Sequence, residues 1–278
     1  AVIVPSAWNQ KVFSNQIGDL NCYLVPHTLD ESIVQPSSLA LLNDLEDKFV
    51  VFAMSQWQNR KGFDKLIQAF CMEFGNQEDA VLIIKTYGVL MFNYPQSPEE
   101  QAQKIAQEVV KYKQSVFLES AKSPRASIML IPNVIPYSEI STIFERADLF
   151  ALLTRGEGFG LPIAESLLHG TPVLVPDTGG HVDYIHPDGA FLVEGHWSPY
   201  VYKPEYTCDM NWYEPHLISA REKFREAYVL WKEGTLSDKG AIGREHLKTI
   251  GYDKDTIGKK MLDVVYKEAA SLEPRGIS

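Results

Sequence analysis

A glycine-rich stretch, residues 156–160, is the first candidate for a ligand-binding site in this sequence. Its three glycines, Gly156, Gly158 and Gly160, allow the backbone to approach a ligand closely. A helix predicted to start directly after them presents unpaired N–H groups and a partial positive charge at its N-terminus. The loop and the helix end together indicate a site for a phosphorylated ligand, although a tight turn between a strand and a helix also needs glycine.

A pair of cations, Arg60-Lys61, follows another predicted strand. Two adjacent positive charges suit a diphosphate, and the alternative is a solvated turn. The carboxyl ends of parallel strands meet at one edge of a sheet, so we expect this pair to lie beside the glycine loop. Independent solvated turns would have no reason to converge in this way.

Two carboxylates frame the same stretch, Glu157 in the loop and Glu165 in the helix. Helical side chains lean toward the N-terminus, so Glu165 is expected to point toward the loop that carries Glu157. A carboxylate accepts hydrogen bonds from neighbouring hydroxyls of a ribose or a hexose. Glu157 has the alternative of being a solvent-exposed acid. Glu165 lies in an otherwise apolar helix, so it is the better candidate for ligand binding.

Apolar strands that alternate with amphipathic helices are predicted around these candidate residues. Continuous apolar runs predict buried parallel strands at 49–54, 81–84, 128–131, 149–153, 173–175 and 191–193. Helices are expected at 63–70, 100–113, 138–145 with Ser138 as cap, 162–169, 217–231 and 254–270. This order predicts an α/β fold with a Rossmann-like, doubly wound parallel sheet, which binds ligands at the carboxyl ends of its strands.

The domain organisation that we expect has four parts. Residues 1–30 read as a strand-helix-strand unit with Ser6 as helix cap, 31–47 as a linker, 48–252 as the main domain and 253–278 as a C-terminal helix. An aromatic segment, residues 196–215, interrupts the alternation. It has two interpretations: a loop packed over the domain, or a surface for an acceptor or a partner.

The composition argues against several classes of function, including nucleic-acid binding and metal binding. The 278 residues carry a net charge of -10, so the overall field repels nucleic acid and anionic lipid. Cys22, Cys71 and Cys208 match no metal spacing and suit buried thiols in a reducing compartment. His181 and His186 lack a third ligand, which disfavours a metal site. No apolar run approaches the about 18 residues that span a bilayer, so we expect a cytoplasmic protein, either free or peripheral at a membrane in full-length form.

Residues 157–165, Glu-Gly-Phe-Gly-Leu-Pro-Ile-Ala-Glu, resemble the E-x7-E motif of the retaining GT-B glycosyltransferases of family 4, the glycogen synthase and sucrose synthase type. Residues 60–70 are similar to the phosphate-binding lysine segment of that family, and 147–150, 170–173 and 178–180 are similar to its usual flanks. The resemblance covers residues 48–193. It implies the donor-binding domain that forms the C-terminal half of a GT-B fold.

The resemblance also implies roles for single residues. Lys61, with Arg60, would neutralise the diphosphate of a nucleotide-sugar linked to UDP, GDP or ADP. Glu165 would bind the ribose and Glu157 the donor sugar ring, while a loop at residues 132–136 would lie against the nucleobase. The remaining donor-binding residues expected from it are Gly158, Phe159, Gly160, Leu161, Asn133, Val134, Ile135 and Ser55.

The family transfers sugar with retention of configuration, by a front-face displacement in which the departing phosphate helps to deprotonate the acceptor. It normally needs neither a metal nor another cofactor, and its acceptor here would be a glycan, a lipid or a protein. The chain departs from the family at Ser55-Gln56, where Gly-Arg is usual, and Arg60 is the candidate that compensates. The family also has an N-terminal acceptor-binding domain, of which residues 1–30 resemble the last unit. We therefore expect a donor-binding fragment.

Two other functions stay open at this point. One is a module that binds a nucleotide-sugar and transfers nothing. The other is a glycoside hydrolase with Glu157 and Glu165 as acid and nucleophile. The glycine loop and the Arg60-Lys61 pair disfavour the hydrolase, because hydrolysis needs no phosphate clamp.

Overall fold

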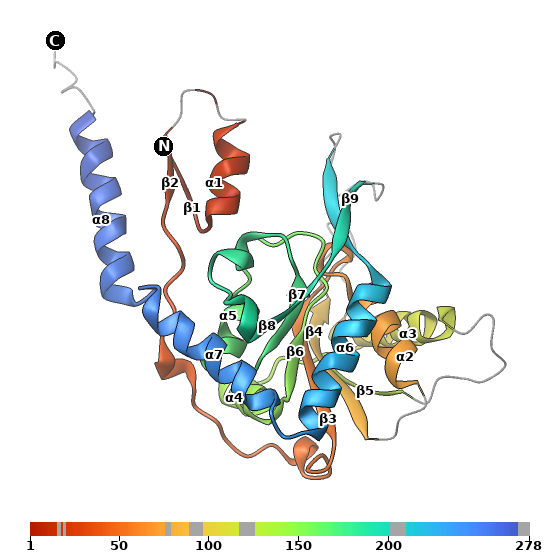
Figure 1. Cartoon of the computed structure of the whole chain (residues 1–278). Helices are drawn as coiled ribbons and strands as arrows, with labels where there is room; N and C mark the ends of the chain where they lie inside the picture. The colour runs from red at the N-terminus through yellow and green to blue at the C-terminus, as the bar shows by residue number, and fades with distance from the viewer. Residues whose placement is uncertain are drawn as a thin grey trace.

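The structure is a computed structural model that describes residues 1–15, 18, 21–75, 79–88, 97–116, 126–200 and 210–271. Its centre is a parallel sheet of six strands in the order β5-β4-β3-β6-β7-β8 (Figure 1). The strands are β3 (Phe49–Trp57), β4 (Ala80–Gly88), β5 (Ser127–Ile131), β6 (Leu149–Ala151), β7 (Val173–Pro176) and β8 (Ala190–Val193). The predicted α/β fold with a doubly wound sheet is confirmed, and each predicted strand of this sheet is present.

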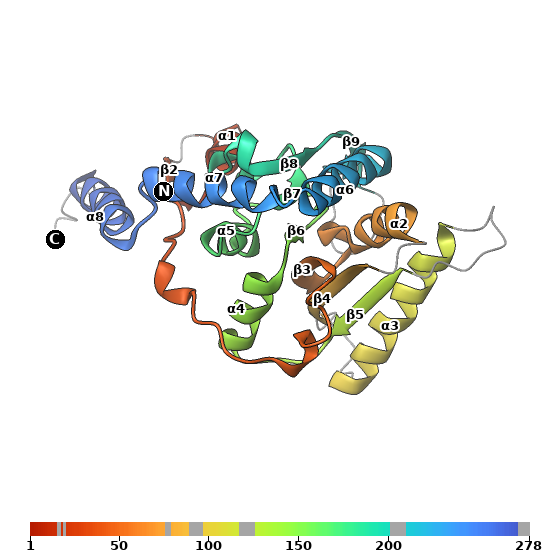
Figure 2. The same cartoon turned by 60° about the horizontal axis from the view of Figure 1, so that its bottom comes forward.

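Helices cover both faces of the sheet, which explains the continuous apolar runs of its strands. One hydrophobic cluster joins the sheet to α2 (Phe63–Phe74), α3 (Pro98–Ser115) and α6 (Leu217–Lys232). A second cluster joins the opposite face to α4 (Tyr137–Arg146) and α5 (Leu161–Leu168). Figure 2 shows these two helices on the other side of the sheet from α2 and α3. The core therefore consists of two apolar layers with the sheet between them.

The strand order places a switch point between β3 and β6. From β3 the chain runs outward to β4 and β5, then returns to pair β6 with the other edge of β3, where Phe52 lies opposite Phe150. Loops that leave the carboxyl ends of these two strands diverge over opposite faces, and this is where such sheets bind ligands. The loops are residues 58–62 after β3 and 152–160 after β6.

The N-terminal segment forms a small separate sheet. β1 (Val2–Val4) and β2 (Cys22–Leu24) pair in parallel and are joined by α1 (Ala7–Ser14), whose cap Ser6 accepts a hydrogen bond from the Asn9 N–H as predicted. The last helix, α8 (Lys254–Ser271), lies beside this sheet (Figure 1). The Tyr23 hydroxyl donates a hydrogen bond of 2.7 Å to Glu268 of α8.

The aromatic segment contains a hairpin that the sequence did not predict. β9 (Gly195–Pro199) and β10 (Asn211–Pro215) pair antiparallel, with Glu214 opposite His196. A proline at the end of each strand obscured the strand pattern in the sequence. Residues 201–209 of the same segment lie outside the described residues.

Two further predictions need correction, and one helix was missed. Ser138 is not the cap of α4, because this helix begins at Tyr137 and no side chain caps it. β6 ends at Ala151, two residues earlier than predicted. Helix α7 (Leu236–Thr249) was not predicted. Gly240 within it disfavours a helix by propensity, but a Cβ there would lie 1.9 Å from the Gly170 carbonyl oxygen, so close packing requires the glycine.

Candidate active site

The two loops at the switch point touch along their backbones. The Arg155 N–H donates a hydrogen bond of 2.7 Å to the Arg60 carbonyl oxygen. Gly62 has φ +67°, and a Cβ on it would lie 1.8 Å from the Leu153 carbonyl oxygen, so only glycine allows this approach. The expected convergence of the cation pair and the glycine loop is therefore present in the structure.

The convergence brings three predicted site residues together. The Lys61 ammonium lies 2.5 Å from a carboxylate oxygen of Glu157, and their side chains are only 11% and 12% exposed. Arg60 donates a hydrogen bond of 2.5 Å to the Gly156 carbonyl oxygen and lies 3.8 Å from Glu157. Burial lowers the pKa of Lys61, while the Glu157 charge opposes this shift. An ammonium group has three donor hydrogens, so Lys61 can contact Glu157 and still donate to an anion.

The glycine loop leads directly into α5. Gly160 precedes the helix with φ +87°, and its carbonyl oxygen accepts a hydrogen bond of 2.9 Å from the Tyr184 hydroxyl. Leu161, the first helical residue, is 43% exposed. Phe159 is buried against the Tyr184 ring, at a centroid distance of 4.9 Å, so a ligand would meet its backbone instead of its ring. The hydrogen bond from Tyr184 thus holds the N-terminus of α5 in place directly after the glycine loop.

A third loop and α1 support the glycine loop from the other side. The Gly180 N–H donates a hydrogen bond of 2.8 Å to the Glu157 carbonyl oxygen, and a Cβ on Gly180 would lie 1.9 Å from the Gly158 carbonyl oxygen. The Ala7 N–H at the start of α1 donates a hydrogen bond of 2.5 Å to Asp183. The N-terminal segment is therefore docked against the candidate site.

Glu165 lies on α5, on the face that packs toward α4. Burial raises the pKa of its carboxyl to about 7, and a hydrogen bond from the Tyr137 hydroxyl opposes part of this shift. Burial also raises the pKa of Tyr137, so its hydroxyl stays a donor. Near neutral pH the Glu165 carboxyl is therefore divided between its charged and neutral forms.

The remaining predicted residues lie at the same edge of the sheet. Ser55 is nearly buried on β3, opposite Thr86 of β4. Asn133, Val134 and Ile135 follow the edge strand β5, and Val134 is 91% exposed. The sheet order separates this loop from the Lys61–Glu157 pair by the width of β4, so one extended ligand would be needed to contact both.

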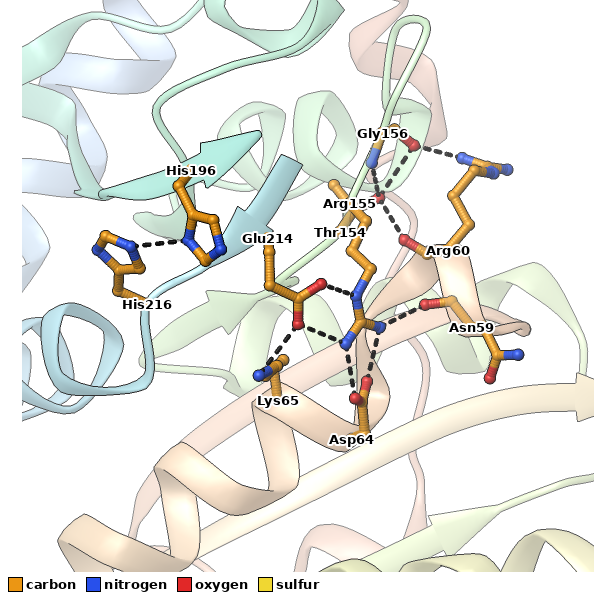
Figure 3. Close-up of polar contacts among 10 residues, drawn as sticks. All are labelled: Asn59, Arg60, Asp64, Lys65, Thr154, Arg155, Gly156, His196, Glu214 and His216. Atoms are coloured by element: carbon orange, nitrogen blue, oxygen red, sulfur yellow. Dashed lines mark hydrogen bonds and ion pairs between the residues drawn. The ribbon is translucent and has the colours of Figure 1, made fainter. Parts of the chain in front are cut away.

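Arg155 is a residue that sequence reasoning missed (Figure 3). Its side chain is 3% exposed, and its guanidinium group binds Asp64 with two hydrogen bonds, of 2.8 and 2.6 Å. It also binds Glu214 of β10 with two hydrogen bonds, of 2.6 and 2.9 Å, and donates to the Asn59 carbonyl oxygen at 2.6 Å. These partners lie 91, 59 and 96 residues away in sequence, so no local pattern indicates them. Arg155 fixes the hairpin to α2 and to both loops.

Two polar residues of β4 were also missed. Lys85 is 5% exposed, and within the described ranges no carboxylate pairs with it; its ammonium lies 3.4 Å from the Thr86 carbonyl oxygen. Burial lowers the pKa of Lys85. The buried Thr86 hydroxyl has no hydrogen-bond partner among the described residues. A lysine at the end of the apolar run 80–84 gave no signal of its own, because its neighbours on β3 and β5 are known only from the fold.

Metal binding, histidine chemistry and a membrane span have little support among the residues that the structure describes. There, no three His, Cys, Asp or Glu side chains gather as they would around a metal ion. His181 is fully buried and hydrogen-bonded to the Pro176 carbonyl oxygen at 2.7 Å, and burial lowers its pKa. None of the described helices has the length and apolar character needed to cross a membrane.

Comparison with known proteins gives a family and several structural neighbours. Residues 40–201 match the family described as Glycosyl transferases group 1. Mannosylfructose-phosphate synthase of Agrobacterium fabrum is 26% identical over 163 residues, which are 57% of this chain and 33% of that protein. The chain therefore spans about a third of this curated relative.

The structural neighbours cover nearly all of the chain. Sucrose-phosphate synthase of Thermosynechococcus elongatus aligns with a TM-score of 0.68 and 17% identity over 98% of this chain and 59% of its own. An α,α-trehalose-phosphate synthase (UDP-forming) of Burkholderia vietnamiensis has a TM-score of 0.70 and 11% identity over 97% and 60%. Anabaena HepE, solved in complex with UDP and glucose, has a TM-score of 0.62 and 18% identity over 98% and 63%. These likenesses show the fold of GT-B glycosyltransferases.

Proposed function

Because the chain belongs to the glycosyl transferases group 1 family, we propose that it is the donor-binding part of a retaining glycosyltransferase of family 4. Such an enzyme would move a sugar from a nucleoside-diphosphate sugar to an acceptor hydroxyl. The observation that carries the proposal is the position of Arg60 and Lys61 against the glycine loop and the N-terminus of α5, at the switch point of the sheet. UDP is the first nucleotide to test, since structures of two of the structural neighbours, HepE and TarM, were solved with it.

The diphosphate would bind between Lys61 and the N-terminus of α5. The buried Lys61 ammonium is balanced by Glu157 in the free protein. An incoming diphosphate would take the remaining donor hydrogens of Lys61, together with backbone N–H groups of residues 158–160. Glu157 would then accept hydrogen bonds from hydroxyls of the donor sugar. Arg60 is placed to add a second positive charge at the same position.

The nucleoside would extend toward α5 and the outer strands. The Glu165 carboxyl would accept hydrogen bonds from the two ribose hydroxyls, which favours its charged form and lowers its raised pKa. Residues 133–135 would contact the base, and Ser55 would line the floor of the site. The distance across β4 between Lys61 and this loop suits an extended ligand such as a nucleoside diphosphate.

The chemical step that we propose is a front-face displacement that needs no metal. The bond between the anomeric carbon and the phosphate oxygen breaks while the acceptor oxygen attacks the same face. The acceptor proton passes to the departing phosphate oxygen, and configuration is retained. Lys61 and Arg60 would stabilise the negative charge that grows on the phosphate, which is where electrostatic catalysis contributes most.

The domain assignment follows from the same proposal. Residues 48–252 would form the donor domain, with residues 1–30 as the last unit of an acceptor-binding domain, 31–47 as a linker and 253–278 as a C-terminal helix. The chain spans 59% of the first structural neighbour, so an acceptor-binding partner domain in the whole protein would complete the site.

Calorimetric titration with UDP, GDP and ADP tests the proposal. At least one nucleotide should bind, and Lys61→Ala should weaken that binding by about 10- to 150-fold, the loss of about 1.5–3 kcal/mol for hydrogen bonds to a charged group. Lys65→Ala is the matched control, because this ammonium lies 3.0 Å from Glu214 and away from the pair. Failure of all three nucleotides to bind, or equal affinity of wild type and Lys61→Ala, would refute the proposal.

A further inference from the structure

A cavity of about 170 Å³ lies between the β9–β10 hairpin, the glycine loop and α1. Five of its twelve lining residues are aromatic, and the polar or charged ones are Arg60, Arg155, Thr178 and Asn211. The lining residues are Trp8, Arg60, Arg155, Gly156, Thr178, Gly179, Trp197, Tyr200, Met210, Asn211, Trp212 and Tyr213. We call this space the hairpin cavity; neither the family resemblance nor the role proposed above for any residue accounts for it.

The aromatic walls of the hairpin cavity are held in fixed positions. The Arg155 guanidinium group lies 4.8 Å from the centre of the Trp212 ring, and Tyr200 meets the same ring edge-on at 5.0 Å. Tyr213 meets Trp197 edge-on at 5.5 Å and donates a hydrogen bond of 2.6 Å to Asp177. Edge-on pairs leave ring faces uncovered. Trp197 remains 54% exposed despite its size.

The hairpin cavity borders the candidate donor site directly. Arg60 and Gly156 line it and are hydrogen-bonded to each other, and each is the chain neighbour of a member of the Lys61–Glu157 pair. A group bound in the cavity would therefore lie next to the sugar of a donor whose diphosphate contacts Lys61. That is the position that an acceptor must take, since reacting atoms approach to about 3–3.5 Å.

Size and chemistry indicate what kind of acceptor group fits. A water molecule occupies about 30 Å³ in the liquid, so the hairpin cavity holds one small ring and excludes a folded peptide or a pair of acyl chains. The C–H face of a pyranose ring packs against the negative face of an indole, and its hydroxyls need donors and acceptors at the rim. Trp197 is an indole that lines the cavity, and the lining residues Asn211 and Thr178 carry the donors and acceptors that such hydroxyls need.

We propose that the hairpin cavity binds one sugar ring of the acceptor, so that the acceptor is a saccharide. The proposal rests on the proposed glycosyltransferase function. It assigns the β9–β10 hairpin as part of the acceptor site and Trp197 as the ring that stacks on the acceptor sugar. The sugar could be neutral or phosphorylated, because the positive charge of Arg60 at the boundary with the donor site could pair with a phosphate group.

Saturation-transfer NMR on the whole chain tests this assignment. The probes are methyl α-D-glucopyranoside, maltose and glucose 6-phosphate, with 4-nitrophenol as an aromatic probe without a saccharide. At least one saccharide should receive saturation, and Trp197→Ala should reduce its affinity by about tenfold. Trp197→Tyr should restore most of the binding, because it retains an aromatic face. Tyr266→Ala is the control, as this side chain is 68% exposed on α8.

The pattern of results decides between the possible ligands. Signals from methyl glucoside and maltose support a neutral saccharide, and a signal from glucose 6-phosphate alone supports a phosphorylated one. Binding of 4-nitrophenol alone, no binding of any saccharide, or equal binding by wild type and Trp197→Ala would overturn the proposal.

Nucleotide titrations of the same variants separate this proposal from the one that it rests on. Trp197→Ala should leave nucleotide affinity unchanged, and Lys61→Ala should weaken the nucleotide while the saccharide still binds. Saccharide binding without any nucleotide binding would refute the acceptor role and the glycosyltransferase proposal together. Nucleotide binding without saccharide binding would refute only the hairpin cavity assignment.

Discussion

Replacement of Glu165 by glutamine should stabilise the free protein at neutral pH and above. The side chain is half-buried, and burial raises its pKa from the ordinary value of 4.5 to about 7. The folded state therefore binds this proton more tightly than the unfolded chain. The stability that the protonated form contributes is fully present below pH 4.5 and is lost as pH rises through about 7.

The size of the effect follows from that difference in pKa. At about 1.36 kcal/mol per pH unit, the change from 4.5 to about 7 corresponds to about 3.4 kcal/mol. Solvent reaches part of the side chain and screens its charge, so we expect about 2 kcal/mol. Glutamine has the shape of the protonated acid and can still accept a hydrogen bond from the Tyr137 hydroxyl. The Glu165→Gln variant should therefore match wild type at low pH and exceed it at high pH.

Urea unfolding, followed by the fluorescence of the five tryptophans, measures the effect. The free energy of unfolding of Glu165→Gln minus that of wild type should be near zero at about pH 3.5 and reach about 2 kcal/mol at about pH 8. Glu245→Gln is the control, because its side chain is 74% exposed and should show no such trend. A difference that does not change with pH, or a Glu165→Gln variant less stable than wild type at about pH 8, would refute the reasoning.

Three further substitutions probe how the site is supported. Arg155→Met should lower the free energy of unfolding by about 3 kcal/mol, because Asp64 and Glu214 would lose the buried positive charge that pairs with them. Lys223→Met removes a charge from an exposed ion pair and should change the free energy of unfolding by less than about 0.5 kcal/mol. Equal effects of the two substitutions would contradict the role of Arg155. Gly62→Ala should lower the melting temperature clearly more than Gly234→Ala, since both have positive φ but only the first would meet a carbonyl oxygen. Lys85→Met should raise the melting temperature at neutral pH, because it removes a buried charge that has no carboxylate partner among the described residues. A lower melting temperature would contradict this reasoning and show that the ammonium group is stabilised in the folded protein.

The sheet and its ligand-binding edge followed from the sequence because their signals are local. Runs such as Val50 to Ala53 are buried on both faces of a parallel sheet, so they are apolar throughout. Gly62 and Gly160 mark points where the backbone takes a left-handed conformation. The loops that follow parallel strands lie at the same edge of the sheet, so the sequence alone predicted that Lys61 lies near Glu157.

The parts that escaped prediction depend on contacts between distant segments. The role of Arg155 requires Glu214, which reaches it only because β10 folds back over the loop. Gly240 broke the helical pattern of α7, although its close packing against the Gly170 backbone makes it necessary. The hairpin cavity combines α1 with a hairpin almost two hundred residues later, so no window of sequence contains it.

The most direct test of the central claim is a crystal structure of the chain with the nucleoside diphosphate that binds it most tightly. We expect the diphosphate within about 3 Å of the Lys61 ammonium and of the backbone N–H groups of residues 158–160, with the ribose hydroxyls on the Glu165 carboxylate. A nucleotide bound elsewhere on the molecule, or one whose diphosphate contacts neither Lys61 nor the glycine loop, would contradict the claim.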